Sequence, residues 1–165
     1  MDNLLSEIKK KVYDKCSCEL SEYEIELESQ EYGACKFELD KSKIISRNSK
    51  ITPKKIGQFV TFWKRGLDGS TMPFEQSDSF DFFVINVASQ QQLGQFVFPK
   101  KVLIQKGIIS TNQKEGKRGF RVYPKWDVPQ NKQATKSQLW QLQYFYEIND
   151  STDIKEVLEL YRIKP

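Results

Sequence analysis

Apolar residues recur at helical spacing in three parts of the chain. Residues 2–15, 52–66 and 152–162 each place their apolar side chains on one face of a helix, so each segment is predicted as an amphipathic helix. The middle segment also has a helix start signal, with Thr52 as N-cap and Pro53 at the first helical position.

Other segments have the period or the composition of β-strands. Residues 22–29 alternate between apolar and acidic side chains, and residues 34–39 and 43–47 are predicted as two short strands joined by a turn. Residues 80–88 form the most continuous apolar run, which is typical of a strand buried on both faces. Residues 94–98 follow after a polar connection, which indicates a hairpin.

The C-terminal half is predicted to mix one strand with further helices. Pro99 opens a short helix that Gly107 ends, residues 120–123 form a strand, and Asn131 caps a helix over residues 132–143. The order of elements predicts an α+β (mixed α/β) fold, with a central mixed sheet flanked by helices.

Length and composition indicate one globular domain, residues 1–165. The mass is 19.4 kDa, 38% of the residues are hydrophobic and 29% are charged. No run approaches the roughly eighteen apolar residues of a membrane span, so we expect no membrane insertion. The N-terminus lacks the apolar stretch of a signal peptide, and the expected location is cytoplasmic.

The chain contains no histidine, which excludes several kinds of active site. Ser-His-Asp triads, Cys-His pairs and histidine-containing zinc sites all need an imidazole. The three cysteines, Cys16, Cys18 and Cys35, are expected to be reduced thiols, and a zinc site would need a fourth ligand that the sequence does not supply. We therefore expect no metal, no cofactor and no catalytic residue.

Charge is distributed unevenly along the chain. Residues 100–136, here called the basic strip, contain ten Lys and Arg against two acids, and three aromatic residues lie among them. Residues 1–30 carry four Lys against eight acids. Cations displace counterions from phosphates and aromatic rings stack on unpaired bases, so the basic strip predicts nucleic-acid binding. The alternative is a solvated basic loop beside buried aromatic residues.

Two residues of the basic strip are open to more than one interpretation. Arg121 points away from the core of its predicted strand, towards either a phosphate or an ion pair with Asp127 or a C-terminal acid. Trp126 either stacks on a base or covers the end of the core. Trp63 and Trp140 lie on apolar helix stripes and are predicted core residues. The predicted nucleic-acid-binding residues are Lys100, Lys101, Lys117, Arg118, Arg121, Lys125, Trp126, Lys132 and Lys136.

Several longer strings carry a family resemblance. They are ESQEYGACKF, TPKKIGQFVTFWKR, GQFVFPKKVLIQKGIIS, EGKRGFRVYPKWD and KQATKSQLWQLQYF. Together they cover roughly residues 28–145, and the chain resembles the MepB-like family of small bacterial cytoplasmic proteins. The resemblance implies a product encoded beside a multidrug efflux pump and its MarR-type repressor, in a family without an established enzymatic activity.

The resemblance also implies a core like that of restriction endonucleases, the PD-(D/E)XK group. Their chemistry needs an acid on one strand and a Glu-x-Lys or Gln-x-Lys on the next, which hold Mg²⁺ and orient water. Asp78 or Asp81 could supply the first acid, but the next strand has Gln95 followed by Val97 where the lysine belongs. We therefore expect a degenerate active site.

These observations predict a non-enzymatic protein that binds DNA or RNA through sequence-independent phosphate contacts, as an accessory of a multidrug-efflux operon. Three alternatives stay open. The acidic N-terminal block could pack on the basic strip of a second copy or of another protein, giving a homodimer or an interaction protein. A metal-dependent nuclease activity could survive, or the aromatic residues could serve a small-molecule sensor.

Overall fold

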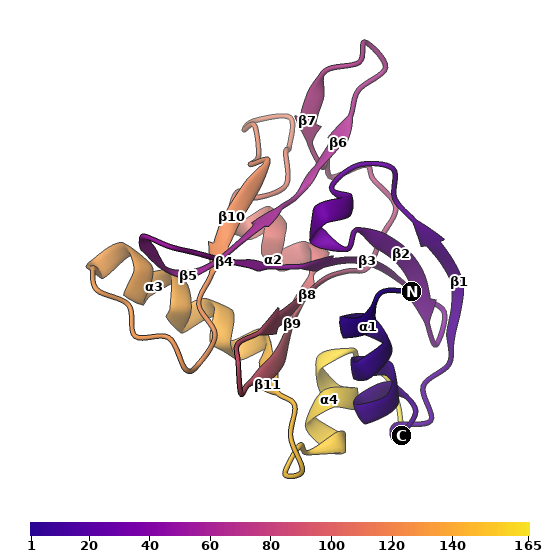
Figure 1. Ribbon diagram of the computed structural model, residues 1–165. Helices are drawn as coiled ribbons and strands as arrows, with labels where there is room; N and C mark the ends of the chain where they lie inside the picture. The colour runs from indigo at the N-terminus through magenta and orange to yellow at the C-terminus, as the bar shows by residue number, and fades with distance from the viewer.

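A mixed six-stranded sheet forms the centre of the molecule in the computed structural model, which describes residues 1–165 (Figure 1). In order across the sheet, the strands are β1 (Leu20–Ile25), β2 (Cys35–Leu39), β3 (Ser42–Asn48), β8 (Phe82–Ala88), β9 (Leu93–Pro99) and β11 (Phe145–Glu147). β3 and β8 are parallel, and every other neighbouring pair is antiparallel.

A smaller antiparallel sheet lies beside the central one. Its strands are β10 (Gly119–Val122), β5 (Lys55–Thr61) and β4 (Lys50–Thr52), with β5 in the middle. The chain continues from β5 into a hairpin of β6 (Trp63–Arg65) and β7 (Thr71–Pro73), which projects at the top of Figure 1.

Four α-helices and three shorter helical turns complete the fold. The α-helices are α1 (Asn3–Ile8), α2 (Lys100–Gln105), α3 (Lys132–Gln141) and α4 (Ile154–Leu160). A π-helical turn (Lys9–Tyr13) extends α1, and 3₁₀ turns cover Gln30–Tyr32 and Leu142–Tyr144. Each helix is too short or too polar to cross a membrane. Helices around a mixed central sheet make a single α+β domain, as the sequence predicted.

The central strands β8 and β9 bury side chains on both of their faces. Phe82 and Val84 belong to a core cluster with α1 and α4, whereas Phe83 and Ile85 belong to a second cluster with the smaller sheet and α2. In Figure 1, α1 and α4 lie together below the central sheet and the smaller sheet lies on its other side. The prediction of a strand buried on both faces is confirmed.

A buried polar cluster links the terminal helices to β9. The Gln95 amide donates to the Tyr13 hydroxyl at 2.9 Å and to the Asn86 side-chain oxygen at 2.8 Å. Its oxygen accepts the hydroxyls of Tyr146 and Tyr161 at 2.5 and 2.6 Å. We call these five residues the Gln95 cluster. The cluster satisfies polar groups that the core would otherwise leave without partners.

The helix predicted over residues 52–66 is wrong. This segment forms the end of β4, all of β5 and all of β6. Its buried side chains alternate with the period of a strand, because Gln58, Val60 and Phe62 are all at most 1% exposed. Pro53 lies in the turn between β4 and β5, where its fixed φ is as suitable as at a helix start.

Trp63 was predicted as a core residue on a helix, but it lies on a strand instead. On β6 this side chain is half-buried, and the Arg65 guanidinium lies 5.3 Å from the centre of its ring.

The remaining predicted helices and strands are present, although β1 occupies Leu20–Ile25 instead of residues 22–29. Gly107 ends α2 with a φ of +70°, and the Asn131 side chain accepts the Ala134 N–H at 2.8 Å.

Candidate functional site

A cleft of about 660 Å³ opens between the β4–β5 hairpin, β10, α3 and the segment that follows α2. These elements lie together on the left of Figure 1. The volume is in the range of ligand-binding sites, roughly 300–1,000 Å³. Its basic side chains are Lys54, Lys55, Lys106, Lys117 and Arg121. We call this site the basic cleft.

The five cations of the basic cleft are uncompensated. No Asp or Glu lines the cleft. The seven ion pairs of the molecule involve none of its five cations. Like charges around one hollow with low-dielectric walls sum to a positive potential inside it. The basic cleft is therefore suited to an anion.

Arg121 is held by neutral groups only. Its Nη1 donates to the carbonyl oxygens of Ile56 and Gly57 at 3.4 and 3.3 Å, and its Nη2 donates to the hydroxyl of Thr52. The alternative predicted from the sequence, an ion pair with Asp127 or with an acid of the C-terminal tail, is not formed. The hairpin thus fixes the guanidinium without neutralising its charge.

Two glutamines of α3 hold β10 and the turn that follows it. Gln141 is 1% exposed, and it accepts the N–H of Tyr123 and donates to the carbonyl of Arg121, both at 2.9 Å. Gln138 donates to the carbonyl of Asp127 at 2.9 Å. Sequence reasoning missed both positioning residues, because glutamines three residues apart on a helix are typical of a solvated face.

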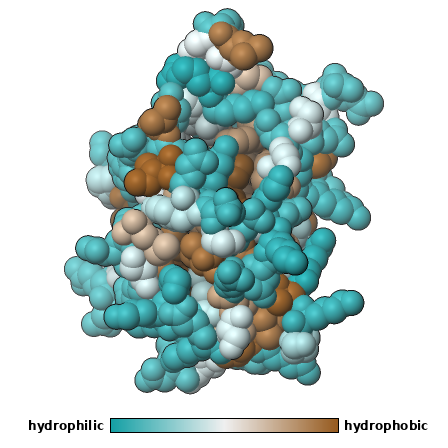
Figure 2. Space-filling view, turned by 90° about the vertical axis from the view of Figure 1, so that its right-hand side faces the viewer, coloured by the Kyte–Doolittle hydropathy of each residue, from teal (hydrophilic) through white to brown (hydrophobic).

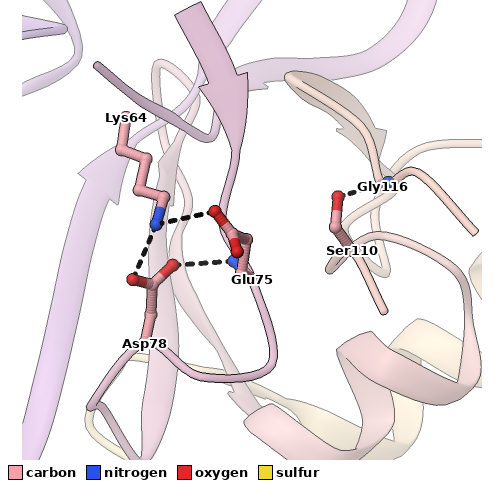
Figure 3. A network of polar contacts seen from close by, with 5 residues as sticks. All are labelled: Lys64, Glu75, Asp78, Ser110 and Gly116. Carbon is pink, nitrogen blue, oxygen red and sulfur yellow. Dashed lines mark hydrogen bonds and ion pairs between the residues drawn. The ribbon is translucent and has the colours of Figure 1, made fainter. Parts of the chain in front are cut away.

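The loop between α2 and β10 places two of the cations. Lys106 directly follows α2, and Lys117 lies near it because its N–H donates to the carbonyl of Ile108 at 2.9 Å. Within the loop, the N–H of Gly116 donates to the hydroxyl of Ser110 at 2.7 Å (Figure 3). Local hydrogen bonds therefore bring Lys106 and Lys117 to one cleft.

Aromatic rings line part of the basic cleft. They belong to Phe120, Tyr123 and Trp140, each half-buried. The Lys106 ammonium lies 5.3 Å from the centre of the Trp140 ring, a cation–π distance. Gly57 has a φ of +85°, and a Cβ there would lie 2.7 Å from the Tyr123 ring. Close contact between the hairpin and Tyr123 therefore requires glycine at this position.

The structure brings together only part of the basic strip. Of the nine binding residues predicted from the sequence, Lys117 and Arg121 line the basic cleft. Lys132 and Lys136 belong to the opposite face of α3, where they line a separate open hollow. The helix that was expected to add these two lysines to one surface instead separates them from the cleft.

The other predicted binding residues lie elsewhere. Lys100 donates to a backbone carbonyl, and Arg118 forms an ion pair with Glu115 at 3.1 Å. Trp126 packs edge-to-face on Phe145 with ring centres 5.8 Å apart, and it lines a smaller groove beside the cleft. Two exposed lysines remain outside the cleft, Lys101 and Lys125.

Sequence reasoning did not name three of the five cleft cations. Lys54 and Lys55 fell within the helix predicted over residues 52–66, whereas they lie at the turn of the β4–β5 hairpin. Lys106 was inside the basic strip but was not selected. The β-branched pair Ile51 and Thr52 before a proline fits a strand and turn as well as a helix start, so this local signal does not decide between a hairpin and a helix.

The positions expected for nuclease chemistry have structural partners. The Asp78 carboxylate accepts the Lys64 ammonium at 2.8 Å and the N–H of Glu75 at 2.7 Å (Figure 3). Asp81 accepts a backbone N–H at the start of β3, also at 2.8 Å. Val97, where a lysine would be needed, is fully buried in the core. No three acidic or cysteine side chains gather closely enough to hold a metal ion.

The thiols are free and protonated at neutral pH. No disulfide links Cys16, Cys18 or Cys35. Burial raises the pKa of Cys18 and of Cys35 to about 12 each, and it raises the pKa of Cys16 as well. A nucleophilic cysteine needs the opposite change, because the thiolate is the reactive form.

Comparison with known proteins agrees with this architecture. The family model described as MepB-like matches residues 26–147. A crystal structure of MepB is 33% identical to the chain, with a TM-score of 0.80, and the alignment covers 92% of this chain and 100% of that one. Among curated proteins, none matches the chain. The family match covers most of the sequence and the structural match nearly all of it, and the chain belongs to the MepB-like family.

Proposed function

We propose that the protein binds nucleic acid, DNA or RNA, by holding phosphates in the basic cleft without regard to base sequence, and that it catalyses no reaction. One observation carries the proposal: five cations surround one cleft that has no carboxylate and no ion pair. Bound phosphates would replace the missing counter-charges, and the release of their own counterions favours binding. The fixed guanidinium of Arg121 matches the geometry of a phosphate.

The proposal also holds that the central sheet resembles the PD-(D/E)XK core of restriction endonucleases and has lost the nuclease activity of that core. Only the strand order supports this idea: Asp81 precedes β8, and Gln95 and Val97 lie on the neighbouring antiparallel strand β9. The register pairs Gln95 with Asn86 and Phe82 with Pro99, so Asp81 and Gln95 lie at opposite ends of this strand pair. The side chain of Gln95 is engaged within the Gln95 cluster, and Val97 replaces the lysine. Without that lysine, the sheet would keep a nuclease-like scaffold and only bind.

An accessory role beside a multidrug efflux pump is also part of the proposal, on the strength of the family resemblance.

A protein-interaction role is the second candidate. Its support is exposed apolar side chains away from the cleft: Leu27 is 87% exposed, Ile25 is 59% exposed and Leu67 is fully exposed. Figure 2 shows a hydrophobic group at the top of the molecule, at the tip of the β6–β7 hairpin, and further hydrophobic patches among hydrophilic atoms below.

A binding titration at two salt concentrations tests the cleft. Fluorescence anisotropy of a labelled oligonucleotide is measured at about 50 and 200 mM NaCl, a range over which phosphate contacts weaken steeply. We expect Arg121→Ala to weaken binding by about 1–2 kcal/mol and to reduce the salt slope by about one. Lys54→Ala should act in the same direction, and its exposed position in a turn keeps the fold intact.

The matched control is Lys132→Ala. It removes the same charge from the opposite face of α3 and should leave affinity nearly unchanged. Circular dichroism confirms that each variant is folded. Equal weakening by Lys132→Ala and Arg121→Ala would show that binding depends only on net charge, and would contradict the assignment to the cleft. Binding that does not respond to salt would contradict phosphate contacts altogether.

A further inference from the structure

An apolar groove of about 260 Å³ adjoins the basic cleft. Its apolar side chains are Ile51, Ile56, Trp126 and Val128. The groove and the cleft share three lining residues, so the two hollows meet along the turn of the β4–β5 hairpin: Lys55, Ile56 and Gln130. A ligand held in the basic cleft can therefore continue into the apolar groove.

The apolar side chains that line the groove are unusually exposed. Ile51 is 64% exposed, Val128 is 69% exposed and Ile56 is 37% exposed. Single apolar residues on a surface are normal, but several around one hollow mark a binding surface. The Trp126 ring is held by its edge-to-face contact with Phe145 and is only half-buried, so it presents a fixed aromatic surface.

We propose that the apolar groove receives an unpaired base while the basic cleft holds the neighbouring phosphates, so that the ligand is single-stranded nucleic acid. This inference rests on the proposed function. A single strand offers flat apolar bases and charged phosphates side by side, which is the order of the two hollows. A duplex covers the faces of its bases by stacking and would leave the groove empty.

Charge supports the same division of the ligand. The apolar groove is lined by one acid, Asp127, and one cation, Lys55, so its charges cancel, whereas the basic cleft has five cations and no acid. A carboxylate repels a phosphate but not a neutral base. The polar side chains of Ser89 and Gln130 lie around the groove and offer hydrogen-bonding groups to a base edge, whereas Gln58 is buried and bonded to Ser49 and Ala88. Phosphates therefore favour the cleft, and bases favour the groove.

The test compares a single strand with a duplex. A labelled oligothymidine of about twelve nucleotides, within the range of single-strand site sizes, is titrated alone and paired with its complement. We expect the double variant Ile51→Ser/Val128→Ser to bind the single strand about tenfold more weakly, because base contacts are lost. Duplex binding and the salt slope should not change, since no charge is removed. Both side chains are exposed, so the variant should fold.

Leu27→Ser is the matched control, because Leu27 is 87% exposed and follows β1 on the other side of the molecule. It should leave both affinities unchanged. If the double variant binds the single strand as tightly as the parent does, this inference is overturned. Arg121→Ala would still test the basic cleft in that case. If neither oligonucleotide binds and poly-glutamate does, an acidic polypeptide is the ligand and both proposals are wrong.

Discussion

Replacing Tyr146 by Phe tests the Gln95 cluster through the pH dependence of stability. Tyr13, Tyr146 and Tyr161 are fully buried, and burial raises the pKa of each phenol well above its usual value of 10.0. In the unfolded chain the same phenols ionise near pH 10. The folded protein therefore keeps protons that the unfolded chain loses, so the tyrosines reduce stability only as the pH rises above about 10.

The size of the effect follows from proton linkage. Each retained proton lowers the free energy of unfolding by about 1.4 kcal/mol per pH unit above the unfolded pKa. At about pH 11 this amounts to about 1.4 kcal/mol for one tyrosine and about 4 kcal/mol for all three. Tyr146→Phe removes one of them. Its loss of stability between about pH 8 and pH 11 should be smaller than that of the parent by about 1.4 kcal/mol.

The assay is urea unfolding of each protein at both pH values. Tyr146→Phe also loses its hydrogen bond to Gln95, which lowers stability at both pH values and cancels in the comparison. Val157→Ala is the control, because it removes buried volume from the same core cluster without removing a titratable group. An equal loss in Tyr146→Phe and the parent would refute the reasoning, since the phenol would then ionise in the folded protein.

Two further predictions concern a buried ion pair and the absence of nuclease activity. Arg47 is 0% exposed and forms an ion pair with Glu26 at 2.6 Å, so Glu26→Ala should lower the free energy of unfolding by about 3–5 kcal/mol in urea titrations. A loss below about 1 kcal/mol would mean that the pair is effectively solvated. Incubation of plasmid or single-stranded DNA with the protein and Mg²⁺ should give no cleavage, because Val97 lies where the proposed PD-(D/E)XK-like core would need a lysine. Cleavage that Asp81→Ala abolishes would restore the nuclease interpretation.

Local sequence patterns were sufficient to predict the centre of the fold. Residues 80–88 and 94–98 form the hairpin of β8 and β9, whose apolar side chains fill both core clusters. The cap at Asn131 and the helix opened by Pro99 were also predictable, because each depends on residues within one helical turn. These elements have a strong short-range signal.

The smaller sheet could not be predicted in the same way. Phe59 and Val60 fit a helical stripe and a strand equally well, and the choice is made by pairing with Phe120 and Arg121 of β10, far along the chain. The basic cleft depends on that pairing, since it places Lys54 of the hairpin and Arg121 of β10 around one hollow. A site assembled by long-range strand pairing has no signal in the spacing of its residues.

The way the basic cleft is built bears on its purpose. The chain has 22 Asp and Glu residues, and other cations have acidic partners, such as Arg65 with Glu28 at 2.8 Å. Around the cleft, neutral groups do the positioning: Gln141 fixes the backbone of Arg121, and Thr52 binds its guanidinium. Like charges gathered without acids oppose folding. A rigid hollow that keeps its charge uncompensated in this way is suited to a ligand that brings several negative charges at once.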